Sequence, residues 1–117
     1  MCRQISRSAL QRLLVAIGGG RDDLDELRSD YLSMAPELVQ RLIGAHARGD
    51  LETLRITAHE LKYNARDFGA EDLADLCEAL ERRARQGADI DRGELDKIAA
   101  AEENARVLLA RLDLSDV

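Results

Sequence analysis

Residues 49–69 of the chain read GDLETLRITAHELKYNARDFG, and this stretch carries the pattern that decides the fold. Gly49 followed by Asp50 is typical of a helix stop and a new N-cap, and Gly69 ends the segment. Between these glycines the apolar residues recur at helical spacing, at Leu54, Ala58, Leu61, Ala65 and Phe68. A helix with one apolar face must bury that face, so the stretch predicts one member of a helical bundle.

Helical periodicity extends over most of the chain, in segments separated by short turns. The segments are residues 6–17, 22–48, 51–68, 73–87 and 91–112. Three glycines at 18–20 end the first segment, and Asp22 or Asp23 can cap the second. Pro36 lies inside the second segment, where we expect a kink rather than a break. Short turns make neighbouring helices antiparallel, so we expect an all-α fold: an antiparallel up-and-down four-helix bundle with a short additional N-terminal helix, in one domain over residues 1–117.

The composition excludes several classes of protein. The 117 residues include 19 Leu and 17 Ala but only 4 Val, 6 Ile and 2 Thr, so helix formers far outnumber strand formers. The net charge of −6 argues against a nucleic-acid partner, because an acidic chain repels a phosphate backbone. No apolar run is long enough for a membrane span or a secretory signal, so the expected compartment is the cytoplasm. Cys2 and Cys77 fit no zinc or disulfide pattern, and we expect both to be reduced thiols.

The quoted stretch carries a histidine on the side of the helix opposite to the apolar residues. At about 100° per residue, His59 falls about 140° from the centre of the apolar stripe, so it faces outward. The same outward arc holds Arg55, Lys62, Tyr63 and Arg66. We expect this positive surround to form an anion site and to favour a neutral imidazole, whose free nitrogen is a nucleophile. The alternative is a solvated helix face without function.

Other polar residues have simpler explanations. His46 lies in the last turn of its helix, where a histidine meets the helix dipole favourably, so we expect a structural role and no second acceptor. A metal site of His46 and His59 would need two helices to converge on one point, and we expect none. Cys77 lies in an apolar stripe and is expected in the core, whereas Glu102 is the one polar residue in the last stripe. The glycines at 18–20 lack the lysine and the preceding strand of a phosphate-binding loop.

Short motifs follow one another in a fixed order around the histidine. They are Ala58-His59-Glu60-Leu61-Lys62, Phe68-Gly69-Ala70, Leu73, Cys77 and Leu80-Glu81. Further motifs lie upstream: Ile17-Gly18-Gly19, Tyr31, Pro36-Glu37-Leu38 and Gly49-Asp50. Together these residues resemble the signature of histidine-containing phosphotransfer (HPt) domains of bacterial two-component phosphorelays, over roughly residues 8–112. The H-x-L-K core alone is a weak signal, but the ordered motifs around it make the resemblance fairly specific.

The resemblance implies a phosphoryl carrier rather than an autonomous kinase. His59 would accept the group from a receiver-domain aspartyl phosphate and pass it to another receiver, and Lys62 would match the family lysine that steadies phosphate charge. The implied partners are response-regulator receiver domains and a hybrid or sensor histidine kinase. No cofactor is implied, because Mg²⁺ would belong to the partner receiver. The expected receiver-facing surface consists of Arg55, Ile56, Tyr63 and Arg66.

One residue departs from the family pattern. HPt domains usually have glycine after the lysine, whereas this chain has Tyr63-Asn64-Ala65. The Tyr63 ring could narrow a partner's approach, donate a hydrogen bond to phosphoryl oxygens or select a particular receiver. One alternative function is therefore a helical adaptor that docks receivers or kinases without being phosphorylated. Another is a structural bundle that dimerises, but Ile56 and Tyr63 are too little apolar surface for an obligate interface, and we expect a monomer.

Overall fold

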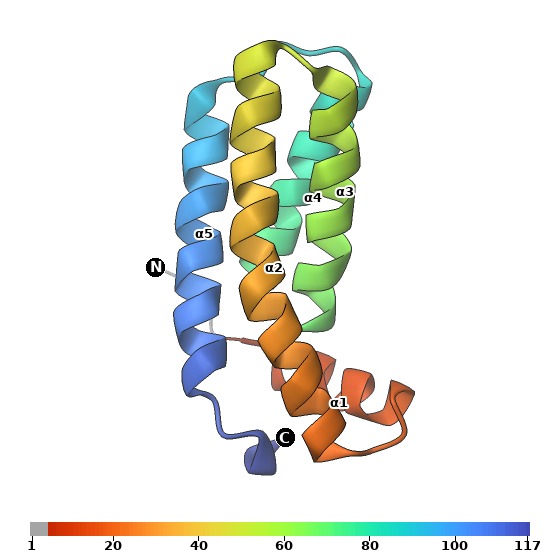
Figure 1. Cartoon of the computed structure of the whole chain (residues 1–117). Helices are drawn as coiled ribbons and strands as arrows, with labels where there is room; N and C mark the ends of the chain where they lie inside the picture. The colour runs from red at the N-terminus through yellow and green to blue at the C-terminus, as the bar shows by residue number, and fades with distance from the viewer. Residues whose placement is uncertain (1–4) are drawn as a thin grey trace.

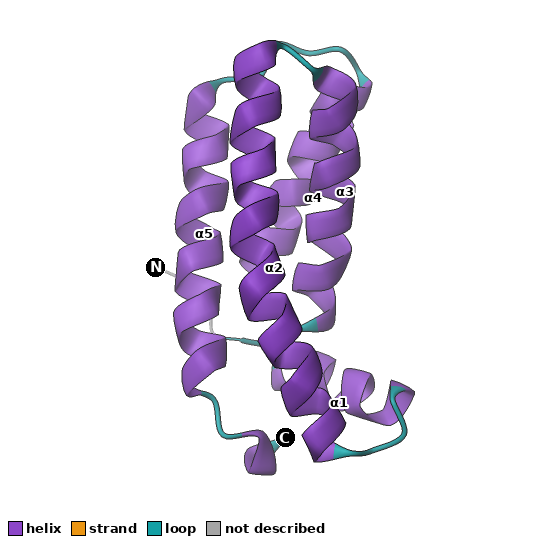
Figure 2. Ribbon diagram, viewed as in Figure 1, coloured by secondary structure: helices purple, strands orange, loops and turns teal. Residues whose placement is uncertain are grey.

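Five α-helices and a final 3₁₀ turn make up most of the structure. The computed structural model describes residues 5–117, and no strand occurs among them (Figure 2). The helices are α1 (Arg7–Ala16), α2 (Arg21–Arg48), α3 (Leu51–Asp67), α4 (Glu71–Arg85) and α5 (Arg92–Arg111), followed by η1 (Leu114–Asp116). Figure 1 shows α2 to α5 side by side along one axis, with α1 at one end of the bundle. The predicted four-helix bundle with a short additional N-terminal helix is confirmed.

Each helix of the bundle turns an apolar face toward the middle. α3 packs against α2 and α4, and α5 packs against the same two helices, so α3 and α5 lie diagonally opposite each other. All five residues of the apolar stripe predicted for the α3 segment are buried. The ring of Tyr31 on α2 stacks on that of Phe68, with the two centroids 4.8 Å apart. Removal of these apolar faces from water is the main stabilising contribution to the fold.

The long helix α2 runs unbroken through Pro36. Proline removes one backbone donor and crowds the preceding turn, which bends a helix. Figure 1 shows the N-terminal part of α2, in orange, leaning away from the axis of the rest. The prediction that Asp22 or Asp23 caps α2 is wrong, because the N-cap residue is Gly20. Because the glycine segment adopts the turn before the helix, α2 begins at Arg21, one residue before Asp22. Asp22 and Asp23 then lie in the first turn, where the helix dipole favours negative charge.

Two glycines with positive φ shape the turns on either side of α3. Gly49, with φ of 69°, ends α2, and Asp50 caps α3 by accepting a hydrogen bond from the N–H of Thr53 at 3.0 Å, as predicted. Gly69, with φ of 78°, follows α3, and its carbonyl accepts a hydrogen bond from the N–H of Ser6 at 2.9 Å. A Cβ atom at Gly69 would lie 2.6 Å from the Ser6 carbonyl oxygen, so glycine is required there. The two turns fix both ends of α3.

A buried charge lies in α5. Glu102, the polar residue of the predicted apolar stripe, is buried and accepts a hydrogen bond from Nε of Arg106 at 3.1 Å. Burial raises the pKa of the Glu102 carboxyl, and the Arg106 guanidinium offsets this effect only in part. Burial also raises the pKa of the Tyr31 phenol, with a further contribution from the Glu102 charge. The ionised form of Glu102 is therefore disfavoured by the fold.

The C-terminal end of α5 is capped by side chains of α2. Nη1 of Arg28 donates hydrogen bonds to the carbonyl oxygens of Leu109 and Leu112, at 3.1 and 2.6 Å. Arg21 donates to two carbonyl oxygens in the residues after α5, at 3.2 and 2.8 Å. These bonds satisfy carbonyl groups that a helix end leaves without a partner, and they attach the last residues of the chain to α2.

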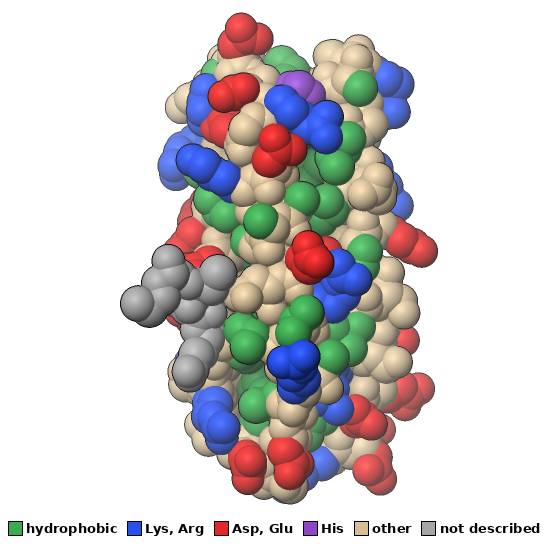
Figure 3. Space-filling view, turned by 90° about the vertical axis from the view of Figure 1, so that its left-hand side faces the viewer, with side chains coloured by type: hydrophobic (Ala, Val, Ile, Leu, Met, Phe, Trp, Pro, Cys, Tyr) green, Lys and Arg blue, Asp and Glu red, His purple; other side chains and the backbone are tan. Residues whose placement is uncertain are grey.

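Charges of both signs are mixed over the surface. Figure 3 shows the side of the molecule that is on the left in Figure 1, where acidic and basic side chains alternate with hydrophobic patches. This face offers no continuous basic surface of the kind that binds a phosphate backbone. Within residues 5–117, none of the helices combines the length and the apolar character that a membrane crossing requires.

Candidate functional site

His59 lies on the outer face of α3, as its angle from the apolar stripe predicts. Its side chain is 49% exposed, yet the ring is held in place, because Nδ1 lies 2.7 Å from Oε2 of Glu81 on α4. An ionised carboxylate only accepts hydrogen bonds, so Nδ1 carries the proton of this bond. In a neutral imidazole the other nitrogen, Nε2, then keeps its lone pair.

Glu81 is at the centre of the site. Its side chain is only 4% exposed and has three donors around it. Oε1 accepts from Nζ of Lys62 at 2.8 Å, while Oε2 accepts from His59 and from Nη2 of Arg85, the latter at 2.9 Å. Burial alone would raise the pKa of the Glu81 carboxyl, but the hydrogen bonds from Lys62 and His59 outweigh it and hold that pKa below its usual 4.5. Glu81 is therefore ionised at neutral pH.

Glu81 was not predicted as a site residue, although it belongs to the motifs that carry the family resemblance. A signal for it was present in the sequence. Glu81 lies four residues after Cys77, on the apolar stripe of α4, so a charged residue occupies a buried position. A buried carboxylate needs partners, but the sequence does not show which side chains of another helix supply them.

The cations predicted beside the histidine all have acidic partners. Nη2 of Arg55 lies 2.6 Å from a carboxylate oxygen of Glu52, and Nη2 of Arg66 lies 3.4 Å from one of Glu78. Lys62, whose side chain is 13% exposed, binds the central carboxylate. The cations predicted around His59 are therefore balanced by negative charge: α4 supplies the carboxylates of Lys62 and Arg66, and Arg55 pairs with Glu52 on α3 itself. A carboxylate is also the group bonded to the imidazole.

Exposed apolar side chains lie one turn before and one turn after the histidine. The ring of Tyr63 meets that of His59 edge to face, with centroids 4.7 Å apart and an angle of 65° between the planes. Nζ of Lys62 lies 4.9 Å from the centre of the same tyrosine ring. Ile56, on the preceding turn, is exposed. The residues predicted to face a receiver all belong to α3: Arg55, Ile56, Tyr63 and Arg66.

This arrangement is suited to nucleophilic chemistry on an anionic group. In its neutral form the His59 imidazole has an unprotonated nitrogen, Nε2, and Lys62 places an ammonium one turn away. The carboxylate of Glu81 stabilises any positive charge that develops on the imidazole. Among residues 5–117, no group of three or more His, Cys, Asp or Glu side chains is arranged to hold a metal ion.

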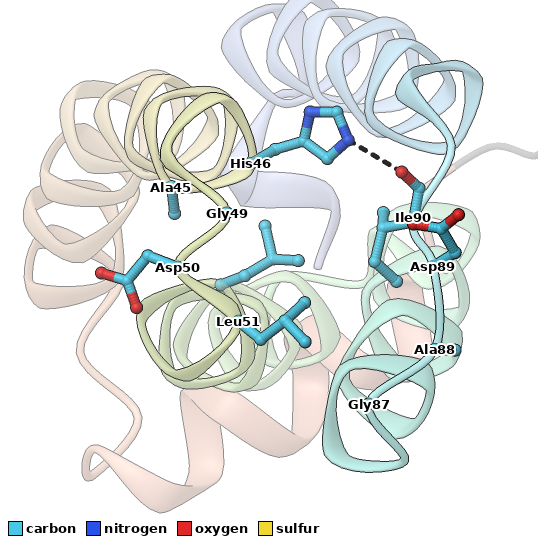
Figure 4. A pocket seen from close by; sticks show the side chains of 10 residues that line it. Ala45, His46, Gly49, Asp50, Leu51, Gly87, Ala88, Asp89 and Ile90 are labelled. Carbon is cyan, nitrogen blue, oxygen red and sulfur yellow. Dashed lines mark hydrogen bonds between the residues drawn. The ribbon is translucent and has the colours of Figure 1, made fainter.

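The second histidine, His46, contributes to the fold at one end of the bundle. Its Nε2 atom lies 2.8 Å from the carbonyl oxygen of Ile90, in the loop between α4 and α5 (Figure 4). Both residues line a pocket of about 340 Å³ between that loop and the turn from α2 to α3. The hydrogen bond between His46 and the Ile90 carbonyl gives His46 the structural role that the sequence predicts. Cys77 is buried, as predicted, and burial raises the pKa of its thiol to about 12, whereas Cys2 lies outside the described residues.

Comparisons with known proteins agree with this geometry. The family model for the Hpt domain matches residues 26–113. Among solved structures, the crystal structure of histidine-containing phosphotransfer protein B (HptB) from Pseudomonas aeruginosa PAO1 is similar to this chain, with a TM-score of 0.83. Its sequence is 25% identical, and the alignment covers 95% of each chain. No curated protein matched the sequence. The segment matched by the family model contains His59, Lys62 and Glu81.

Proposed function

This chain belongs to the Hpt domain family, and from that premise we propose that His59 is the residue on which it carries a phosphoryl group. Family membership and the similarity to HptB support a histidine phosphotransfer role in a phosphorelay. The observation that carries the choice of residue is the bond from Nδ1 of His59 to Glu81, which leaves Nε2 of the half-exposed ring without a protein partner in that bond and, in the neutral imidazole, with its lone pair. His46, by contrast, uses its Nε2 atom in the bond to Ile90.

The proposed transfer starts from a receiver domain that carries an aspartyl phosphate. The Nε2 lone pair of His59 attacks phosphorus in line with the P–O bond to the aspartate. A P–N bond forms while that P–O bond breaks, and the aspartate leaves as a carboxylate. The proton on Nδ1 stays in place, so the ring gains positive charge, which the ionised Glu81 stabilises from 2.7 Å. Transfer to a second receiver reverses these steps.

Lys62 is proposed to steady the phosphoryl oxygens. Its ammonium is held 2.8 Å from Oε1 of Glu81, one turn from His59. A compact ammonium acts as a point charge on the oxygens over which the negative charge is spread. Replacement of Lys62 by alanine should slow transfer about 10-fold to 1000-fold, if the ammonium supplies about 1.4 to 4 kcal/mol of transition-state stabilisation.

The proposed partners are receiver domains of response regulators and a hybrid or sensor histidine kinase. The kinase would phosphorylate the first receiver, and this chain would pass the group from that receiver to another. Mg²⁺ would be held by the receivers, so the chain needs no cofactor of its own. In this role the protein is a monomeric carrier in the cytoplasm, and it is not an autonomous kinase.

A second candidate is an adaptor that docks receivers or kinases without being phosphorylated. The position of Tyr63 favours it, because the ring lies against the imidazole and restricts access to it. The bond between His59 and Glu81 favours the carrier, because an adaptor has no need of an oriented imidazole. The two candidates differ in whether His59 acquires a phosphoryl group.

Incubation with a phosphorylated receiver tests the proposal. We expect the wild type to become labelled at His59 through an acid-labile, alkali-stable P–N bond. His59→Gln should abolish the label and keep its helicity by circular dichroism, and the control His46→Gln should keep the label. Label that persists in His59→Gln would contradict the assignment. A receiver that binds the wild type without labelling it would identify an adaptor instead.

A further inference from the structure

Tyr63 is a large side chain that contributes little to the core. It is 54% exposed, and it lies on the outer face of α3 rather than in the apolar stripe. Its ring contacts the imidazole of His59, and the ammonium of Lys62 lies over the same ring. An exposed aromatic ring that meets both groups of the proposed reaction is placed to influence either their chemistry or the choice of partner.

The contact covers one side of the imidazole. The edge-to-face geometry places the tyrosine ring with its centroid 4.7 Å from that of His59, so no other atom can occupy that side. A phosphorus atom has to come within about 3 to 3.5 Å of Nε2 for reaction. A small phosphoryl donor can use the open sides of the ring. A receiver, however, brings a folded surface around its aspartyl phosphate, and that surface has to accommodate Tyr63.

The Tyr63 ring also favours an apolar partner surface over a charged one. A half-exposed phenol presents mostly apolar carbon, and the neighbouring exposed side chain on the other flank of His59 is Ile56. Charged groups pressed against these two side chains would lose water without gaining a partner. An apolar recess, in contrast, would gain from burying them.

We propose that Tyr63 is a specificity-determining residue, which admits receivers that have an apolar recess for its ring beside the phosphorylated aspartate and excludes those that do not. This inference rests on the proposed function of His59 as phosphoryl carrier. A receiver without the recess is held too far away for Nε2 to reach phosphorus. Selection of this kind acts by a steric clash against wrong partners as well as by contact with the right ones. The phenolic hydroxyl is not required.

Three variants separate the ring from other effects. Tyr63→Ala removes the ring, and Tyr63→Phe keeps the ring but removes the hydroxyl. Val107→Ala is the matched control, because it also truncates an exposed apolar side chain but lies on α5, diagonally opposite α3. Melting curves by circular dichroism verify that each variant is folded before its rates are compared.

Two kinds of donor are then compared for each variant. Phosphoramidate is the small donor, which gives its phosphoryl group to an imidazole nitrogen and releases ammonia. A panel of several purified phosphorylated receivers supplies the large donors. For Tyr63→Ala we expect receivers that are poor donors to the wild type to improve by about 10-fold or more, while the best wild-type donor does not improve. Labelling by phosphoramidate should stay within about 2-fold of wild type. Tyr63→Phe and Val107→Ala should keep the wild-type ranking of receivers.

Several outcomes would overturn the inference. An equal change for every receiver and for phosphoramidate in Tyr63→Ala would show that the ring positions His59 or Lys62 and does not select partners. An unchanged set of rates would show that the ring has no role in transfer. A changed ranking in Tyr63→Phe would assign the effect to the hydroxyl. If neither phosphoramidate nor any receiver labels wild-type His59, the proposed carrier function itself fails, and this result is distinct from the other three.

Discussion

Replacement of Glu81 by glutamine should destabilise the protein and disturb the imidazole. The carboxylate accepts hydrogen bonds from Lys62, His59 and Arg85. A glutamine side chain has one acceptor oxygen and one NH₂ donor in the same space. In either orientation the NH₂ group faces a donor: Lys62 in one case, His59 and Arg85 in the other. The variant therefore loses a charge pair and gains an unfavourable donor–donor contact.

The size of the effect follows from the burial of the partners of Glu81. Loss of one partner of a buried hydrogen bond costs about 1 to 3 kcal/mol, and loss of one partner of a buried ion pair costs about 3 to 5 kcal/mol. Arg85 is 62% exposed and adds little. Because Lys62 is 13% exposed and keeps some water, we expect a decrease of about 2 to 4 kcal/mol in the free energy of unfolding. For a chain of this size that corresponds to a fall of about 8 to 16 °C in Tm.

Urea unfolding at several pH values measures this loss, with Glu78→Gln as the control. Glu78 is an exposed carboxylate on the same helix, so its replacement should change stability by no more than about 0.5 kcal/mol. The pKa of Glu81 is held below 4.5 in the folded state, so its stabilisation is complete above pH 4.5 and is lost as pH falls through the folded pKa. The difference between wild type and Glu81→Gln should therefore be fully present at pH 7 and shrink as the pH falls below 4.

The imidazole provides an independent readout. Nitrogen NMR of the neutral His59 imidazole should show the proton on Nδ1 in the wild type and a mixture of the two tautomers in Glu81→Gln. The reasoning is refuted if Glu81→Gln is as stable as Glu78→Gln at pH 7. It is also refuted if the stability difference grows as the pH falls below 4, because a carboxylate with a lowered pKa cannot behave in that way.

Three further predictions concern the fold. Glu102→Gln should raise Tm at pH 7 and have no effect well below pH 4.5, because the raised pKa of the buried carboxyl makes its ionised form unfavourable in the folded state; a lower Tm at pH 7 would contradict this. His46→Ala should lower the free energy of unfolding in urea by about 1 to 3 kcal/mol, since the carbonyl of Ile90 loses its donor, and an unchanged value would show that water replaces the ring freely. Gly87→Ala should lower the free energy of unfolding by about 1 to 2 kcal/mol, because of its positive φ alone. Gly69→Ala should lower it clearly more, because the new Cβ atom would also clash with the Ser6 backbone. Equal losses would show that the Ser6 backbone moves away from the new Cβ atom at little cost in free energy.

The fold could be predicted from the sequence because its signals are local. The apolar spacing of each helix and the pair Gly49-Asp50 depend only on neighbours in the chain, and they are found as expected except at Leu27 of α2, which the same spacing places in the apolar stripe but which is exposed. The outward direction of His59 follows from the same periodicity. The start of α2 was misjudged because both Asp22 and Gly20 are acceptable caps, and the choice depends on how the preceding glycines turn.

The candidate site could be predicted only in part, because its central contact joins two helices. The spacing on α3 places His59, Lys62 and Tyr63 together, and this grouping is found in the structure. The partner that orients the imidazole comes from α4, and the rotation of α4 against α3 is set by packing that a single sequence does not display. The acidic partners of Lys62 and Arg66 escape sequence reasoning for a related reason, because a count of charges on one helix face omits what the next helix adds. Glu52, the partner of Arg55, lies three residues earlier on α3 and is visible in the sequence.

The diagonal placement of α3 and α5 has an evolutionary consequence. In the part of the chain that the structure describes, α5 packs on α2 and α4 and lies diagonally opposite α3. On α3, one side of the helix must fill the core and the other side must preserve His59 and its partners. The outer surface of α5 is free of the second constraint. Among descendants of this chain, we expect the exposed residues of α5 to diverge fastest, and insertions or fused domains to be tolerated there first. The lineage can thus acquire new attachments while the phosphotransfer chemistry proposed for α3 is inherited unchanged.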